Sequence, residues 1–174
     1  MNKKLIFTLA IALLLTGSLM AQDNTPKPTI DKRKNAQCFS DGLQCKYRED
    51  VDGAIRNCEN ALKFMPNDAA SMYELSEQYV MADRMADAFA MIKNAVETEP
   101  SNKWYKIRLG KFYRNYEMYD EFIALYGALT EEYPEDMDML SEYIDVLLVV
   151  QDYDKALKEI DLLEQQIGQN ELID

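Results

Sequence analysis

The sequence predicts an all-α fold, a right-handed superhelical solenoid of about four helical hairpins. Pro66, Pro100 and Pro134 lie 34 residues apart in a stretch that otherwise nearly lacks proline. Apolar residues between them recur at spacings of three and four, which is the period of an amphipathic helix. Because proline cannot continue a preceding helix, each proline marks the same break in the same repeating unit.

The first 21 residues predict a secretory signal peptide. Lys3 and Lys4 form a positive start, residues 5–15 form an apolar run, and Ala21 stands before Gln22. The run is shorter than the ~20 residues that a membrane span needs, although an uncleaved membrane anchor is the alternative interpretation. The twin-lysine start and short apolar run look bacterial. We therefore expect an exported protein of the periplasm or cell envelope, or a secreted one, with no membrane span after signal cleavage.

Residues 22–35 are polar, contain two prolines and lack periodicity, so they predict a flexible leader. The helical pattern then covers residues 36–170, which we expect to form the repeat domain. Laying the units over one another gives four frames: 35–68, 69–102, 103–136 and 137–170.

Small residues recur at the eighth and twentieth places of these frames. The eighth place holds Gly42, Ser76, Gly110 and Ile144, and the twentieth holds Ala54, Ala88, Phe122 and Ala156. Two antiparallel helices joined by a tight turn approach closely at these places, where a large side chain would hold them apart. The pattern therefore predicts hairpins that pack alike in each unit, with Ile144 and Phe122 as departures.

A leucine, a small residue and a tyrosine recur at one spacing in the second and third units. They stand at Leu75-Ser76-x2-Tyr79 and Leu109-Gly110-x2-Tyr113. Together with the phased alanines and prolines, they resemble the tetratricopeptide repeat (TPR), a 34-residue unit with W-x2-L-G-x2-Y, A-x3-F and P. The resemblance covers nearly all of the chain after residue 35. It departs from the family at the fourth place, which never holds tryptophan, at Asp41 in place of leucine, and at Gly168 in place of proline.

The resemblance implies that the first helix of each hairpin lines a concave groove that binds a peptide or a helix. The groove residues it implies are Tyr73, Glu77, Met81, Trp104, Ile107, Arg108, Lys111, Arg114, Asn115 and Asp145. Some TPR proteins clamp a terminal carboxylate from five groove positions, which here hold Phe39, Leu43, Glu74, Trp104 and Arg108. Only Arg108 fits that clamp, so we do not expect it here. We predict an interaction scaffold for a protein or peptide partner.

The third unit carries a run of cations between residues 103 and 114. They are Lys103, Lys106, Arg108, Lys111 and Arg114, interleaved with aromatic residues and with no acid among them. One interpretation is a cationic, aromatic groove floor for an acidic or carboxylate-ended peptide. The other is a solvated face whose cations pair with acids of the neighbouring units. Those acids would be Glu74, Glu77, Asp138, Glu142 and Asp145.

Charge and composition exclude several classes of function. From Gln22 onward there are 31 acidic residues against 17 basic ones, once Lys3 and Lys4 are left out of the total of 19, which gives a net charge of −14. Repulsion therefore disfavours nucleic acid as a partner. The chain has no histidine and no metal, phosphate or nucleophile motif, so we expect no enzyme activity, no metal and no cofactor.

All three cysteines, Cys38, Cys45 and Cys58, fall in the first unit. Cys38 and Cys45 lie seven residues apart on one helix, about 10 Å, which is too far for a disulfide between them. Cys58, on the second helix, could pair with either. A thiol-linked redox or folding factor is therefore the alternative function, and three small buried packing residues are the alternative structural role.

The second helix of the last hairpin, about residues 153–167, carries an apolar stripe. No polar-faced capping helix is evident after it, so we expect some apolar surface to be exposed there. Self-association through the C-terminal hairpin, a partner that completes the stack, and a shortened form of a longer repeat protein are the three interpretations.

Overall fold

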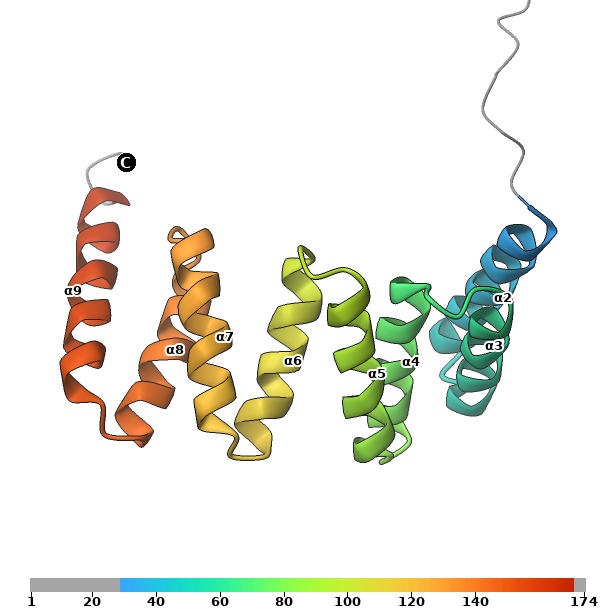
Figure 1. The fold of residues 1–174 in the computed structure, drawn as a ribbon, viewed down its shortest axis with the longest axis horizontal. Coiled ribbons are helices and arrows are strands. Elements are labelled where there is room, and N and C mark those ends of the chain that lie inside the picture. Colours follow the sequence, from blue (N-terminus) through green and yellow to red (C-terminus); the bar gives the residue numbers. More distant parts are fainter. Residues whose placement is uncertain (1–28, 171–174) are drawn as a thin grey trace, which may run out of the picture.

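The computed structural model describes residues 29–170, and this part of the chain is built from helices. The expected signal peptide, residues 1–21, and the first half of the leader lie outside the described residues. The helices are α2 (Ile30–Tyr47), α3 (Val51–Phe64), α4 (Ala69–Met81), α5 (Met85–Thr98), α6 (Lys103–Asn115), α7 (Tyr119–Glu132), α8 (Met137–Val149) and α9 (Tyr153–Asn170). They form four antiparallel hairpins that follow one another along an elongated, curved stack (Figure 1). The predicted all-α solenoid is confirmed.

The first helix begins earlier than the sequence predicts. α2 starts at Ile30, whereas residues 22–35 were expected to form a flexible leader. The side chain of Thr29 caps the helix, and Asn35 is buried and donates from Nδ2 to the carbonyl of Ala61 at 3.1 Å. This contact ties a polar stretch to the first hairpin, so polar composition alone placed the boundary too late.

The turn inside each hairpin has one backbone conformation, repeated every 34 residues. Its left-handed residues are Glu49, Asp83, Glu117 and Gln151, with φ of 60°, 57°, 57° and 63°. In each turn the next N–H bonds a carbonyl five residues back, as from Asp50 to Cys45 at 2.9 Å. This is the Schellman motif, which satisfies the last carbonyls of a helix. The sequence concealed it because none of the four residues is the glycine that usually occupies this position.

Each turn between hairpins contains one of the phased prolines, as predicted. A capping residue stands two positions after each proline, and its side chain accepts a hydrogen bond from the first turn of the next helix. The capping residues are Asp68, Asn102 and Asp136. Proline and cap together fix where one hairpin ends and the next begins.

The helices of the hairpins meet at the eighth and twentieth places, and all eight side chains or backbones there are buried. In the second unit the Ser76 hydroxyl donates to the carbonyl of Ala88 at 2.9 Å. In the third unit a ring replaces the alanine. Phe122 is 0% exposed and stacks on Tyr126 with ring centroids 4.0 Å apart. Gly110 makes room for Tyr126, because a Cβ there would overlap its ring.

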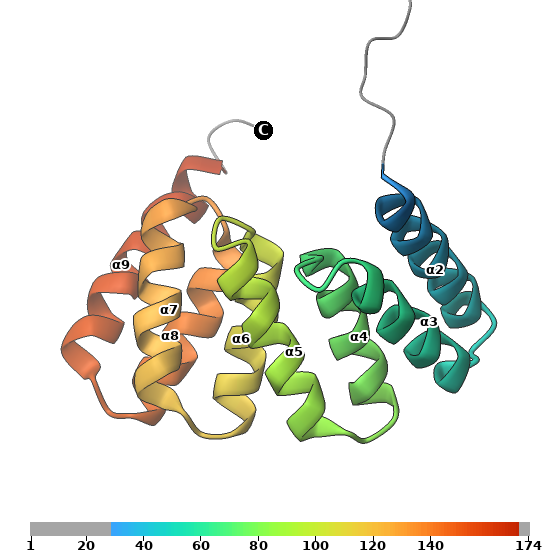
Figure 2. The same ribbon diagram turned by 45° about the vertical axis from the view of Figure 1, so that its right-hand side comes forward.

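The core consists of two clusters that divide the third hairpin between them. α6 contributes Tyr105, Leu109 and Phe112 to the cluster of the first three units. α7 contributes to the cluster shared with α8 and α9. Half-buried Tyr113 and Leu125 pack against both clusters, which joins them into one stack. α6 therefore sits near the middle of the molecule, supported from both sides (Figure 2).

The last helix exposes apolar side chains beside a stripe of polar ones, which agrees with the expected exposed apolar surface. Ala156 is buried and Leu163 half-buried against the stack. Half a helical turn away from this buried stripe lie exposed polar residues, Asp154, Lys158, Asp161 and Gln165. Tyr153, Leu157, Leu162 and Ile167 are exposed on the flanks of the stripe and beyond it. Apolar surface is thus exposed on α9 but not as one continuous outer face, and self-association through this hairpin stays a prediction.

Candidate binding surface on α6

Three residues of α6 form an exposed stripe along the helix. Trp104 is 68% exposed, Ile107 is half-buried and Lys111 is exposed. Because they follow one another by three and four residues, they lie on one side of the helix. The side chain of Asn102 caps α6 by accepting a hydrogen bond from the Trp104 N–H at 3.1 Å, so the indole starts from an ordered turn.

A pocket of about 260 Å³ lies between α6 and the start of α8, and we call it the α6–α8 pocket. It brings the three stripe residues to the acids of the next unit. Its lining residues are Trp104, Ile107, Lys111, Tyr126, Asp136, Asp138, Met139 and Glu142. The pocket therefore combines an exposed indole, apolar walls and carboxylates.

A second pocket of about 70 Å³ lies between α6, the end of α4 and the start of α5, and we call it the α4–α6 pocket. It is lined by Val80, Met85, Arg108, Lys111, Phe112 and Asn115. Lys111 lines both pockets, so it separates two recesses of the same surface.

Four of the five cations in the third unit are used in ion pairs. The pairs are Lys103–Asp136 at 2.7 Å, Lys106–Glu132 at 3.4 Å, Arg108–Glu77 at 2.5 Å and Arg114–Glu142 at 4.0 Å. The solvated-face interpretation therefore holds for these four, although Asp136 and Glu132 were not among the expected partners. Lys111 makes no ion pair within residues 29–170.

The charged groups around the α6–α8 pocket are held by their neighbours. The hydrogen bond from Lys103 lowers the pKa of the Asp136 carboxyl, which also accepts from the Met139 N–H. Burial raises the pKa of Tyr126, and its hydroxyl donates to Glu142 at 2.9 Å. Asp136 is therefore ionised at neutral pH, and the hydrogen bond from Tyr126 orients the Glu142 carboxylate.

The structure gathers only part of the predicted groove set. Trp104, Ile107, Arg108, Lys111 and Asn115 line the two pockets. The remaining five lie outside the pockets: Tyr73, Glu77, Met81, Arg114 and Asp145.

Those five residues have other surroundings. Tyr73 stacks on Tyr105 with centroids 5.1 Å apart, and Glu77 and Arg114 make ion pairs. Met81 is 71% exposed and Asp145 is also exposed.

Sequence reasoning missed Met85 and Met139 as lining residues, and it considered Glu142 only as an ion-pair partner. Met85 opens the second helix of its hairpin, and the family pattern assigns the groove to first helices alone. The position that the carboxylate clamp would require, Glu74, is buried and binds Lys46 at 2.7 Å. That clamp is therefore absent from this face.

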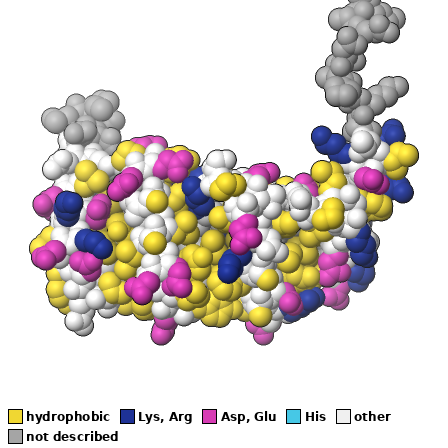
Figure 3. All heavy atoms as spheres, viewed as in Figure 1, with side chains coloured by type: hydrophobic (Ala, Val, Ile, Leu, Met, Phe, Trp, Pro, Cys, Tyr) yellow, Lys and Arg dark blue, Asp and Glu magenta, His cyan; other side chains and the backbone are white. Residues whose placement is uncertain are grey.

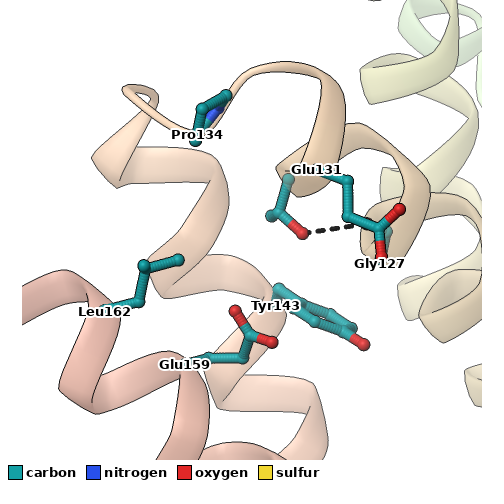
Figure 4. Close-up of a pocket in the computed structure, with 7 residues that line it drawn as sticks. Gly127, Glu131, Pro134, Tyr143, Glu159 and Leu162 are labelled. Carbon is teal, nitrogen blue, oxygen red and sulfur yellow. Dashed lines mark hydrogen bonds between the residues drawn. The ribbon is translucent and has the colours of Figure 1, made fainter.

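A further pocket of about 230 Å³ lies between α7, α8 and α9 (Figure 4). Glu131 of α7 and Glu159 of α9 line it from two sides, and the ring of Tyr143 reaches from α8 toward Gly127. Its charged lining is acidic only, and no unpaired cation or exposed indole accompanies it. The surface on α6 is therefore the better candidate for binding a partner.

Apolar side chains also reach the surface elsewhere along the stack, beside acidic ones (Figure 3). Within the described residues, no helix is long and apolar enough to cross a bilayer. No group of three or more acidic or cysteine side chains in that part of the chain is arranged to hold a metal ion.

The three cysteines are free thiols in the structure, with Cys38 and Cys45 half-buried and Cys58 fully buried. Cys58 packs over Gly42 across the first hairpin, where a Cβ on the glycine would lie 3.1 Å from Sγ. Burial raises the pKa of Cys58 to about 12. The thiol is therefore protonated at neutral pH, which makes it a poor nucleophile.

Cys58 makes the free energy of unfolding fall at alkaline pH. Its pKa is about 12 in the folded chain against 9.0 for an unperturbed thiol, so the folded state holds the proton more tightly. This contribution is complete below pH 9 and is lost as the pH rises from 9 toward 12, at up to about 1.4 kcal/mol per pH unit. We expect Cys58→Ala to flatten the fall in unfolding free energy between pH 8 and 10, measured by urea denaturation. Equal slopes in the wild-type protein and Cys58→Ala would contradict the assignment.

The sequence matches no protein-family model and no curated protein. Solved structures do share its fold. One is a crystal structure of MamA protein, 18% identical, with a TM-score of 0.68 over 78% of this chain and 74% of that chain. Another is YrrB, described as a TPR protein with an unusual peptide-binding site, 16% identical, with a TM-score of 0.66 over 74% of this chain and 66% of that chain.

A third is an O-GlcNAc transferase mutant from Thermobaculum terrenum, 18% identical, with a TM-score of 0.57. The match covers 69% of this chain but 23% of the transferase. The chain therefore has the tetratricopeptide-repeat fold, an α-solenoid of four hairpins. Sequence identities this low establish the fold alone. The absence of enzyme activity stays a prediction.

Proposed function

We propose that this chain is an exported TPR scaffold of the bacterial periplasm or envelope that binds a protein or peptide through α6. One observation carries the proposal. Trp104 is exposed at one pocket, and Lys111 lines both pockets without an ion pair in residues 29–170, whereas the other four cations of the unit are engaged in ion pairs. Export rests on the pattern of residues 1–21.

An exposed indole beside a recess is suited to binding. Tryptophan and arginine are the residues that most often carry binding energy, and they do so where pockets let them be fully desolvated. The recesses exist before any partner arrives, because α6 is packed into the core from both sides. A preformed surface loses little conformational entropy on binding, which favours affinity.

The proposal predicts that Trp104→Ala weakens partner binding by at least 30-fold, the loss of about 2 kcal/mol that defines a hot spot. Partners are first captured in the native cell with a photo-crosslinking residue at Ile107, and the affinity of a captured partner is then measured with purified proteins. Tyr47→Ala is the matched control, because Tyr47 is an 88% exposed aromatic residue outside both pockets. It should change the affinity less than three-fold. The proposal would be contradicted if both substitutions weakened the affinity equally. It would also be contradicted if the crosslinker at Ile107 captured no more partner than a crosslinker at Lys158 on α9.

The thiol-linked redox or folding factor stays the alternative hypothesis. It rests on the grouping of Cys38, Cys45 and Cys58 in one hairpin and requires Cys58 to pair with one of the other two. Thiol titration of the protein isolated from its native compartment, with and without reductant, decides it. Three titratable thiols without reductant would end this alternative.

A further inference from the structure

The two pockets beside α6 differ in charge. The α4–α6 pocket is lined by Arg108 and Lys111 and by no acid. The α6–α8 pocket is lined by three carboxylates against Lys111. A ligand that crosses α6 therefore meets a basic recess on one side and an acidic recess on the other.

Most of the charged side chains that line the two pockets are paired within the protein, and two of them are not. Arg108 is neutralised by Glu77, Asp136 by Lys103, and Glu142 accepts from Tyr126 and faces Arg114 at 4.0 Å. Lys111 and Asp138 line the pockets without an ion pair in the described part of the chain. They are the charges left over for a ligand.

The acidic recess fits a basic side chain. Asp138 is exposed beside Trp104, and an ammonium or guanidinium group above the indole face gains both a cation–π contact and a charge-assisted hydrogen bond. The ammonium of Lys103 lies at the edge of this place, but it is paired with Asp136 at 2.7 Å. It lies 4.4 Å from the Tyr133 ring centroid and 5.8 Å from that of Trp104.

The basic recess fits an acidic side chain. Lys111 lines a space of about 70 Å³ whose apolar walls include Val80, Met85 and Phe112. A carboxylate on Lys111 can lay its methylene groups against these walls. A polyanion is disfavoured on the same surface, because the neighbouring recess is acidic.

Helix geometry sets the spacing between the two ligand charges. Trp104 and Lys111 are seven residues apart, or about 10 Å along α6. A peptide extended in the polyproline II conformation advances about 3.1 Å per residue and brings every third side chain to the same face. We propose that the α6 surface binds an extended peptide segment with one acidic and one basic side chain about three residues apart, the acid on Lys111 and the base on Trp104 and Asp138. This inference rests on the proposed function and specifies its ligand.

The test is selection of random 12-residue peptides, displayed on phage, against the purified chain and its variants. Wild type should enrich acid–base pairs at a spacing of about three residues. Lys111→Glu should reverse the preference at the acidic position, and Asp138→Lys should reverse it at the basic position. Each reversal should weaken peptides selected on wild type at least ten-fold, read out by the fluorescence of Trp104, which is the single tryptophan of the chain.

Matched controls are Lys158→Glu and Asp161→Lys, exposed helix positions outside both pockets that should leave the selected peptides unchanged. Peptides that depend on Trp104 but ignore both charge reversals would overturn this inference and leave the proposed function standing. If Trp104→Ala abolishes no enrichment, or if nothing is enriched on wild type, the proposed function fails together with this inference.

Discussion

Gly110→Ala is expected to destabilise the fold by about 2–3 kcal/mol, although alanine is the better helix former. A Cβ at this position overlaps the ring of Tyr126, which has no room to yield. That ring is 0% exposed, stacks on Phe122 and is held by the hydrogen bond from its hydroxyl to Glu142. Accommodating one methyl group therefore means breaking the stack or moving α6 away from α7.

Two other glycines provide matched controls for the same substitution. At Gly168 of α9 an added Cβ meets nothing within 4 Å, so Gly168→Ala should stabilise the chain by up to about 1 kcal/mol. At Gly42 the Cβ would lie 3.1 Å from the Sγ of Cys58, which predicts an intermediate effect. Urea denaturation followed by circular dichroism gives the three values. The free energy of unfolding should be lowest for Gly110→Ala, intermediate for Gly42→Ala and highest for Gly168→Ala. Any other order would show that the ring of Tyr126 can move.

The 34-residue period could be predicted because the residues that mark it act on the backbone and helix contacts nearest to them. Proline ends a helix wherever it stands, and the two phases of small residues report close helix packing without knowledge of the neighbours. The hairpin turns could not be found in this way. Glu49, Asp83 and Glu117 adopt a left-handed backbone because the surrounding helices impose it, and their side chains give no sign of it.

The candidate site, too, could be predicted from the sequence only in part. Trp104, Ile107 and Lys111 follow from their places on a first helix, since that depends on register alone. The two pockets depend on the distance between units, which the sequence does not state. Asp136 shows the difference, because its place after Pro134 predicts a helix cap, while its contact with Lys103 at 2.7 Å arises only when the units stack.

Phe122→Ala is expected to destabilise the chain by about 3–5 kcal/mol. The family pattern suggests the opposite, because Ala54, Ala88 and Ala156 occupy this place in the other units and a consensus residue commonly stabilises. In the third unit, however, the ring is fully buried and stacked on Tyr126, so alanine leaves a cavity where the other units have close helix contact. Phe122→Leu should lose less, because it keeps most of the volume. Equal or greater stability of Phe122→Ala would show that α6 and α7 close to the spacing of the other hairpins.

The double variant Gly110→Ala with Phe122→Ala tests whether one ring causes both effects. Each substitution acts through Tyr126, the first by pushing on its ring and the second by removing its support. With the space of Phe122 empty, the ring can move away from the new methyl group. The combined loss should therefore be smaller than the sum of the single losses by about 0.5–3 kcal/mol, as for residues that share a partner. Strict additivity would mean that α6 and α7 respond independently, and that the third hairpin is not held open by the Phe122–Tyr126 pair.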